Sequence, residues 1–162
     1  MKFTAAILTI SDSCHRGVRE DLSGPKLQRT LVEAGFEVVI TRVLPDDAEQ
    51  IAPALREVAA KACFVVTTGG TGISARDVTP EATRSVCDRL LDGVAELMRA
   101  EGTKQTRFAA LSRGVCGTIG KSLVLNLPGN PAGAQHSLQS VMHLIPHALD
   151  LLAGKTEHSA AQ

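Results

Sequence analysis

Short apolar runs rich in β-branched residues alternate along this chain with segments whose apolar residues recur every three or four positions. The first pattern is typical of a buried strand, and the second of a helix with one buried face. Strands that alternate with helices predict a mostly parallel sheet covered by helices. This alternation therefore places the chain in the α/β class, and a length of 162 residues fits one domain.

The same patterns predict where the elements lie. Strands are predicted at residues 4–10, 36–43, 63–68 and 123–127, and helices at residues 24–34, 51–62, 79–90, 94–99 and 134–152. Because proline lacks an amide hydrogen, we expect Pro53 to delay or kink its helix and Pro146 to bend the last one. Thr79 is the expected cap of its helix, with Pro80 in the first position. Residues 1–154 are expected to form the domain, and residues 155–162 a flexible polar tail.

Composition narrows the classes of ligand. Seventeen basic and seventeen acidic residues leave no net positive charge for nucleic acid or an anionic membrane. Aromatic residues make up 2% of the chain, so a stacking platform for single-stranded nucleic acid lacks its main material. No run approaches the roughly 18 apolar residues of a membrane span, and the N-terminus has no signal-peptide cleavage pattern. We therefore expect a cytoplasmic protein that binds a small molecule.

The cysteines are widely spaced and form no C-x-x-C pair, which argues against a zinc site or a redox motif. We expect reduced thiols at Cys14, Cys63, Cys87 and Cys116.

Polar residues follow four of the predicted elements where loops begin. In an open parallel sheet, the loops that leave the carboxyl ends of the strands converge and form the ligand site. These loops are Ser11-Asp12-Ser13, Pro45-Asp46-Asp47, residues 69–77 and Pro128-Gly129-Asn130-Pro131. Their shared placement predicts one site.

The glycine cluster at residues 69–72 is the tightest in the chain. Glycines let backbone amides point at an anion, as phosphate-binding loops require, although they also suit a tight strand-to-helix turn. Two other nucleotide motifs fit less well. The G-x-G-x-x-A spacing at residues 70–75 does not open a helix, and the G-K-S sequence at residues 120–122 lacks the first glycine of a P-loop at the right distance.

Two aspartates, Asp46 and Asp77, follow successive predicted strands. Such carboxylates could hold Mg²⁺ while a nucleotide supplies phosphate oxygens, which would suit phosphoryl or nucleotidyl transfer. The alternative for each aspartate is a turn or a helix cap, and Asp47 is the better cap candidate. Position alone does not decide between these interpretations.

Two further groups of polar residues allow more than one interpretation. Ser112-Arg113-Gly114 offers a hydroxyl, a guanidinium and an open amide to a phosphate or polar heterocycle, but it could equally be a surface turn. Three histidines lie near one face of the last predicted helix without the acidic base of a zinc-protease motif, so we expect a solvated or interface face. They are His136, His143 and His147.

Seven motifs, taken in order, resemble the molybdopterin-binding domain of the MogA/MoaB family. They are T-I-S-D-S (9–13), D-x-S-G (21–24), L-P-D-D (44–47), T-T-G-G-T-G (67–72), R-D-V-T-P-E (76–81), L-S-R-G (111–114) and N-L-P-G-N-P (126–131). The likeness covers roughly residues 4–152. It implies a three-layer α/β/α sandwich that assembles as a homotrimer or as a larger assembly such as a hexamer.

The resemblance also implies a function, that of a molybdopterin adenylyltransferase. Such an enzyme uses Mg-ATP to attach AMP to the terminal phosphate of molybdopterin and releases pyrophosphate. The implied catalytic and Mg²⁺-binding residues are Asp46 and Asp77. The implied nucleotide-binding residues are Ser11, Asp12, Gly69, Gly70, Thr71 and Gly72, and the implied pterin-binding residues are Ser112, Arg113, Gly129, Asn130 and Pro131.

A molybdate-inserting enzyme of the MoeA type is the protein partner that the resemblance implies. Two alternatives remain open. One is a module that binds molybdopterin without adenylylating it. The other is a MoeA-type molybdotransferase, for which a chain of 162 residues is short.

Overall fold

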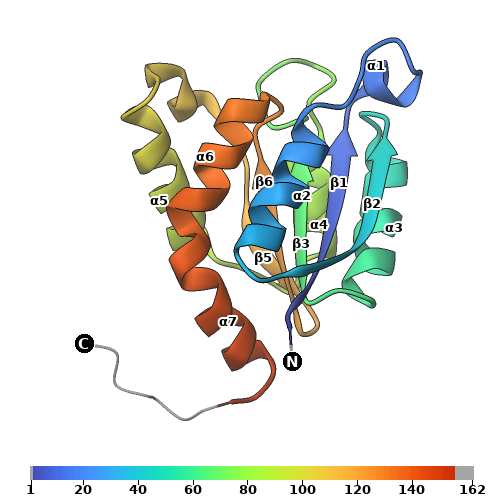
Figure 1. The fold of residues 1–162 in the computed structure, drawn as a ribbon. Helices are drawn as coiled ribbons and strands as arrows, with labels where there is room; N and C mark the ends of the chain where they lie inside the picture. Colours follow the sequence, from blue (N-terminus) through green and yellow to red (C-terminus); the bar gives the residue numbers. More distant parts are fainter. Residues whose placement is uncertain (1, 156–162) are drawn as a thin grey trace.

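Six strands form one sheet in the order β2-β1-β3-β6-β5-β4 in a computed structural model, which describes residues 2–155 (Figure 1). The first four strands in this order are parallel, and β5 and β4 extend the sheet in antiparallel fashion. The strands are β1 (Thr4–Ile10), β2 (Glu37–Leu44), β3 (Phe64–Thr68), β4 (Arg89–Leu90), β5 (Cys116–Ile119) and β6 (Ser122–Leu127). The predicted α/β class with a mostly parallel sheet is thus confirmed.

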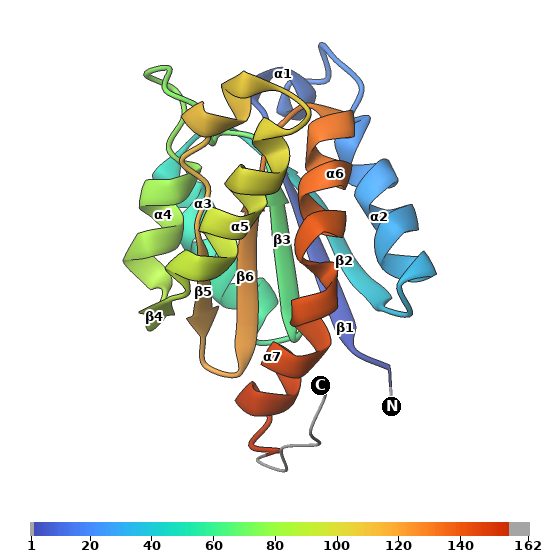
Figure 2. The same cartoon turned by 90° about the vertical axis from the view of Figure 1, so that its left-hand side faces the viewer.

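Helices cover both faces of the sheet and make the three layers (Figures 1 and 2). One face carries α2 (Ser23–Glu33), α5 (Asp92–Thr103), α6 (Pro131–Val141) and α7 (Ile145–Leu152), and the other carries α3 (Ala48–Ala59) and α4 (Thr79–Val86). The short helices are α1 (Asp12–His15) and the 3-10 turns η1 (Arg107–Leu111) and η2 (Met142–Leu144). Among residues 2–155, no helix is long and apolar enough to cross a membrane.

Two apolar cores lie on the two sides of the sheet. Ala5 and Ile7 of β1 face the core beneath α2 and α6, whereas Ala6 and Leu8 face the core beneath α3 and α4. Successive side chains of a strand point to opposite faces, so a strand covered on both sides reads as a continuous apolar run. These cores fix β1, β2 and β3 side by side, with their carboxyl ends at one edge.

Several helix ends differ from the prediction. Helix α2 begins at Ser23, ahead of Pro25, where the Asp21 carboxylate accepts a hydrogen bond from the Gly24 amide at 2.9 Å. Val78 holds the cap position before α4, because the Thr79 hydroxyl instead donates to the Gly69 carbonyl at 2.9 Å. The start of α4 is therefore anchored to the glycine loop.

The prolines also act differently from expectation. Helix α3 begins before Pro53 and continues through it, so the predicted late start is wrong; Asp47 caps this helix, as predicted, by accepting from the Glu49 amide at 2.9 Å. Pro146 lies in the first turn of α7, and a 3-10 turn separates α7 from α6. The long last helix is therefore interrupted where a bend is predicted.

Four elements have no counterpart in the sequence prediction: α1, β4, β5 and η1. β4 has two residues and β5 four, which is too short for a recognisable period of two. All four cysteines are free, as expected. Of the predicted tail, residues 156–162 lie outside the described residues.

Candidate functional site

The loops that follow β1, β2 and β3 meet at one edge of the sheet, where Figure 1 shows α1 beside the loop after β3. Asp12 follows β1, Asp46 follows β2, and residues 69–77 follow β3. The Ser11 amide donates to the Leu44 carbonyl at 2.9 Å and so joins the first two loops at their bases. The structure therefore brings together three of the four loops that the sequence singles out at this edge.

Asp12 and Asp46 hold each other through reciprocal hydrogen bonds. The Asp12 amide donates to Oδ2 of Asp46 at 3.0 Å, and the Asp46 amide donates to Oδ1 of Asp12 at 3.0 Å. Arg76, in the loop after β3, donates from Nε and Nη2 to the two carboxylate oxygens of Asp12, each at 3.0 Å. All three loops are thus tied together by polar contacts. Arg76 was not among the predicted site residues, although it precedes Asp77 in a quoted motif.

Asp46 and Asp77 both lie against the glycine loop. A methyl group on Gly70 would lie 3.0 Å from Oδ1 of Asp46, and one on Gly72 would lie 2.8 Å from Oδ2 of Asp77. Gly70 also has a φ of 67°, which side chains rarely adopt, and its added methyl group would lie 2.3 Å from the Thr79 hydroxyl. Bare Cα atoms are therefore needed for both carboxylates to approach this loop.

The electrostatics of the two linked aspartates differ. Burial raises the pKa of Asp46, and the negative charges of Asp12 and Asp77 raise it further, against the hydrogen bond from the Asp12 amide. The hydrogen bond from the Asp46 amide lowers the pKa of Asp12, as does the Arg76 guanidinium. Asp12 is thus compensated by a cation, whereas Asp46 faces like charge.

This arrangement fits Mg²⁺ bound together with a phosphate ligand. Within residues 2–155, Oδ1 of Asp46 and Oδ1 of Asp77 accept no hydrogen bond, so each carboxylate has an oxygen available. No cluster of three or more His, Cys, Asp or Glu side chains suited to a metal occurs in the described part of the chain. Mg²⁺ is commonly held by one or two carboxylates together with substrate phosphates and water, which matches two aspartates.

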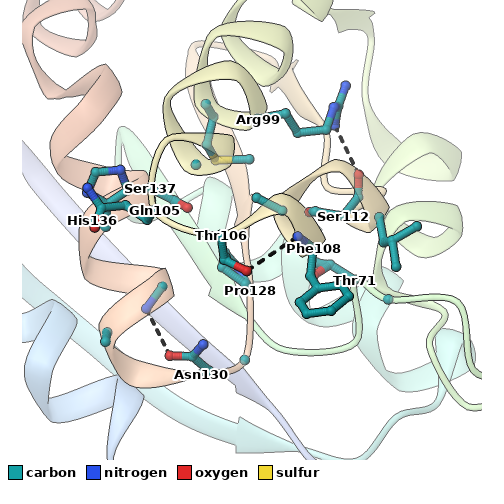
Figure 3. A pocket seen from close by; sticks show the side chains of 18 residues that line it. Thr71, Arg99, Gln105, Thr106, Phe108, Ser112, Pro128, Asn130, His136 and Ser137 are labelled. Atoms are coloured by element: carbon teal, nitrogen blue, oxygen red, sulfur yellow. Dashed lines mark hydrogen bonds between the residues drawn. The ribbon is translucent and has the colours of Figure 1, made fainter.

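A cavity of about 520 Å³ borders the glycine loop (Figure 3). Predicted nucleotide residues Thr71 and Gly72 line it, together with predicted pterin residues Ser112, Gly129 and Asn130. The rest of the wall comes from Met98, Arg99, Gly102, Gln105, Thr106, Phe108, Ala109, Leu111, Pro128, Ala132, Gly133, His136 and Ser137. The glycine loop therefore lines the cavity with Thr71 and Gly72. It lies against the carboxylates of Asp46 and Asp77 at Gly70 and Gly72.

The remaining predicted site residues lie outside the cavity wall. Gly69 packs on the end of β1, since an added methyl group would lie 2.1 Å from the Ile10 carbonyl oxygen. Gly129 approaches the same glycine, with its own added methyl group 3.2 Å from the Cα of Gly69. Pro131 is the first residue of α6, behind Asn130, whose side chain caps that helix by accepting from the Gly133 amide at 2.9 Å. Arg113 turns its side chain toward the glycine loop, where Nε donates to the Gly72 carbonyl at 2.7 Å.

Several residues of the cavity wall could not be predicted from the sequence. Arg99, Gln105, Thr106 and Phe108 come from α5 and the segment after it, and none belongs to a quoted motif. His136 is half-buried in the wall and approaches the Glu101 carbonyl at 3.3 Å, so of the two predicted alternatives a solvated face is wrong for it and an interface stays a prediction. The solvated face is confirmed for the two exposed residues His143 and His147.

The chain matches a known protein family and several named proteins. Residues 6–147 match the family described as "Probable molybdopterin binding domain". The chain is 40% identical to the molybdopterin adenylyltransferase of Helicobacter pylori, over 91% of this chain and 86% of that protein. It is 36% identical to the molybdopterin adenylyltransferase of Escherichia coli, over 96% of this chain and 88% of that protein.

A longer relative and a solved structure agree with this family. The chain is 40% identical, over 92% of its length, to the molybdenum cofactor synthesis protein cinnamon of Drosophila melanogaster, but it spans 25% of that protein. Its fold matches the crystal structure of the molybdopterin biosynthesis enzyme MoaB from Thermus thermophilus with a TM-score of 0.89 and 46% identity. That match covers 94% of this chain and 98% of the other.

Proposed function

The chain belongs to the molybdopterin-binding domain family, and from this premise we propose that it is a molybdopterin adenylyltransferase. The reaction transfers AMP from Mg-ATP to the terminal phosphate of molybdopterin and yields adenylyl-molybdopterin and pyrophosphate. The observation that carries this proposal is the glycine loop, which has Asp46 and Asp77 against it and the cavity beside it. One loop would thereby hold two substrates in contact.

The chemistry needs no nucleophile from the protein. An oxygen of the terminal phosphate of molybdopterin attacks the α-phosphorus of ATP, a new P–O bond forms, and the bond to the β-phosphate breaks. Pyrophosphate leaves with the electron pair of that bond. The barrier is the approach of two anions, so the task of the protein is positioning and charge compensation.

The named residues divide this task. Mg²⁺, held by Asp46 and Asp77, would compensate the phosphate charge. The glycine loop 69–72, with Ser11 and Asp12, would orient the triphosphate; since the Gly69 amide donates to the Leu127 carbonyl at 3.1 Å, the loop would act through the amides of residues 70–72. Ser112, Gly129 and Asn130 would contact the pterin in the cavity, whose volume of about 520 Å³ lies within the usual range for small-molecule sites.

A molybdopterin-binding module without activity is the second candidate. The adenylyltransferase names of relatives that align over most of their length favour the enzyme. Both Asp46 and Asp77 are present, and a site that only binds the pterin would not need two carboxylates that lie against the glycine loop and outside the cavity wall.

The setting of the enzyme belongs to the same proposal. We propose a homotrimer, or a hexamer of two trimers, that acts in the cytoplasm. Its activated product would be consumed by a reaction that inserts molybdate, carried out by a MoeA-type enzyme. Light scattering coupled to size-exclusion chromatography measures the assembly, and a monomer at micromolar concentration would exclude the trimer.

Pyrophosphate release tests the activity directly. The purified protein is mixed with Mg-ATP and molybdopterin, and pyrophosphate is measured with a coupled assay. We expect release that requires both substrates and stops when EDTA removes Mg²⁺. Tight molybdopterin binding without any pyrophosphate would contradict the enzyme and favour the binding module.

A further inference from the structure

Arg113 follows the cavity-lining residue Ser112 but does not itself line the cavity. Its Nε donates to the Gly72 carbonyl at 2.7 Å, and its Nη2 donates to the Asp77 carbonyl at 2.8 Å. Its own amide donates to the Thr71 carbonyl at 2.8 Å. One residue therefore holds three carbonyls of the loop that carries Asp77, including the carbonyl of Asp77 itself.

Glu81 of α4 fixes the guanidinium in this position. It forms an ion pair with Arg113, and this contact lowers the pKa of the Glu81 carboxyl. Glu81 does not line the cavity. A planar guanidinium can serve two carbonyls and a carboxylate at once, whereas a lysine ammonium acts as a point charge and lacks this fork.

The residues on either side of Arg113 are fixed to the cavity wall. Arg99 of α5 donates from Nη1 to the Gly114 carbonyl at 2.8 Å and reaches the Ser112 carbonyl at 3.5 Å, as Figure 3 shows for the latter. Ser112 itself lines the cavity. Within this segment, Ser112 therefore lines the cavity proposed for the pterin, and the next residue, Arg113, contacts the loop that carries Asp77.

We propose that Arg113 is a positioning residue, which sets the place of Asp77 relative to the cavity and couples the occupancy of the two substrate sites. This inference rests on the proposed adenylyl transfer, and it differs from the pterin contact that the family resemblance implies for Arg113. Arg113 acts through the loop backbone, and Ser112 is the residue of this pair that meets the pterin.

Steady-state kinetics of Arg113→Gln and Arg113→Lys test the positioning role. We expect kcat to fall roughly 10- to 100-fold in Arg113→Gln, because misplacement of a catalytic group by about 1 Å has effects of this size. Arg113→Lys should lie between Arg113→Gln and the wild type. Molybdopterin affinity, measured by calorimetry without nucleotide, should stay at the wild-type value in both variants.

Two matched variants separate positioning from pterin contact. Ser112→Ala should weaken molybdopterin binding measured without nucleotide, which is the quantity that Arg113→Gln should leave unchanged. Glu81→Gln, which changes a residue remote from the cavity, should reproduce the kcat loss of Arg113→Gln in weaker form. Arg113→Gln with the phenotype of Ser112→Ala would overturn the proposal.

Coupling is measured by binding a non-hydrolysable ATP analogue with Mg²⁺, with and without molybdopterin. We expect molybdopterin to tighten analogue binding by about fivefold or more in the wild type, and this effect to vanish in Arg113→Gln. Equal coupling in the wild type, Arg113→Lys and Glu81→Gln would refute the inference even if Arg113→Gln fails to fold.

Hydrogen exchange of the amides in residues 72–77 separates this inference from the proposed function. Exchange should be faster in Arg113→Gln and Glu81→Gln than in the wild type, whether or not the protein makes pyrophosphate. A wild type without activity would refute the adenylyl transfer, and unchanged exchange in both variants would refute the positioning by Arg113.

Discussion

Asp12 and Asp46 exchange backbone hydrogen bonds, yet their carboxyl pKa values move in opposite directions. The raised pKa of Asp46 means that the folded protein disfavours its charged form. The stability that this group contributes is therefore fully present below its unfolded-state pKa and is lost as pH rises through the folded-state pKa. For Asp12, with a lowered pKa, the contribution is present above the unfolded-state pKa and is lost as pH falls.

The variant Asp46→Asn should therefore be more stable than the wild type at pH 7, while it loses adenylylation. The neutral amide still accepts from the Asp12 amide but carries no charge beside Asp12 and Asp77. Thermal unfolding followed by circular dichroism between pH 3 and pH 8 measures the difference, which should shrink as pH falls. Asp12→Asn is the matched control and should lower the Tm at pH 7. A lower Tm for Asp46→Asn would show that charge repulsion does not dominate there.

Asp77→Asn should leave the fold intact and remove most of the activity. The amide oxygen of asparagine can still accept from the Ser74 amide and hydroxyl, which now bind Oδ2 of Asp77 at 3.0 and 2.7 Å. We expect kcat to fall at least about 100-fold, the size of effect seen when one preorganised electrostatic group is removed. Pyrophosphate release measures kcat, and circular dichroism checks the fold. Near-normal turnover would exclude Asp77 from the reaction.

The sequence allows the prediction that Asp46 and Asp77 lie near one glycine loop, because both follow parallel strands. It does not reveal which way a side chain turns. Arg113 lies in the segment between η1 and β5, and its direction depends on carbonyls at Gly72 and Asp77 that are brought close only by folding. Arg76 is similar, since its partner Asp12 lies 64 residues away along the chain.

Among the elements, β6 depends on a polar network as well as on apolar packing. Asn126 is fully buried, and its Nδ2 donates to the hydroxyls of Thr67 and Thr83, each at 3.0 Å. Its Oδ1 accepts from the Val115 amide at 3.2 Å. This one side chain therefore links β6 to β3, to α4 and to the segment before β5.

Replacement of Asn126 by alanine should lower the free energy of unfolding by about 2–4 kcal/mol, because several buried polar groups lose their partners. Urea unfolding followed by circular dichroism measures this change. The exposed residue Gln139 of α6 offers a control, and Gln139→Ala should change the free energy by less than about 0.5 kcal/mol. A loss in Asn126→Ala as small as that in the control would show that water replaces the network.

The strands and helices predicted from the sequence agree with the structure where the apolar pattern extends over many residues. The bounds of β1 agree with the prediction at both ends, since its run of seven apolar or β-branched residues ends at the polar Ser11-Asp12-Ser13. Of the hairpin formed by β5 and β6, the sequence predicts only β6. Gly117 interrupts the apolar pattern of β5, and Gly120 lies in the turn that follows it. A proline signals an interruption, but packing decides its form: α3 tolerates Pro53, whereas Pro146 starts a new helix.

For the whole molecule, the two cores explain why the convergence of the loops is predictable and the cavity is not. Strands joined by helices that cross over the sheet run parallel to one another, as β1, β2, β3 and β6 do, so their carboxyl ends share an edge. The cavity instead assembles from α5, η1, α6 and the glycine loop, which are far apart in sequence. No periodic pattern in the sequence predicts that these segments come together around a cavity. Arg99 and Phe108 therefore cannot be recognised from the sequence as cavity-lining residues.

Ligand binding should therefore stabilise the whole fold, since the nucleotide and the pterin each contact loops from several elements. A ligand at about 100 times its Kd adds about 2.7 kcal/mol, which corresponds to a rise in Tm of about 5–10 °C for a domain of this size. Differential scanning fluorimetry with Mg-ATP or with molybdopterin measures each rise. In Asp77→Asn the rise with Mg-ATP should largely disappear, because the metal loses a carboxylate. The rise with molybdopterin should persist, because Asp77 does not line the cavity. If both rises fall together in this variant, Asp77 is not specific to the nucleotide part of the site.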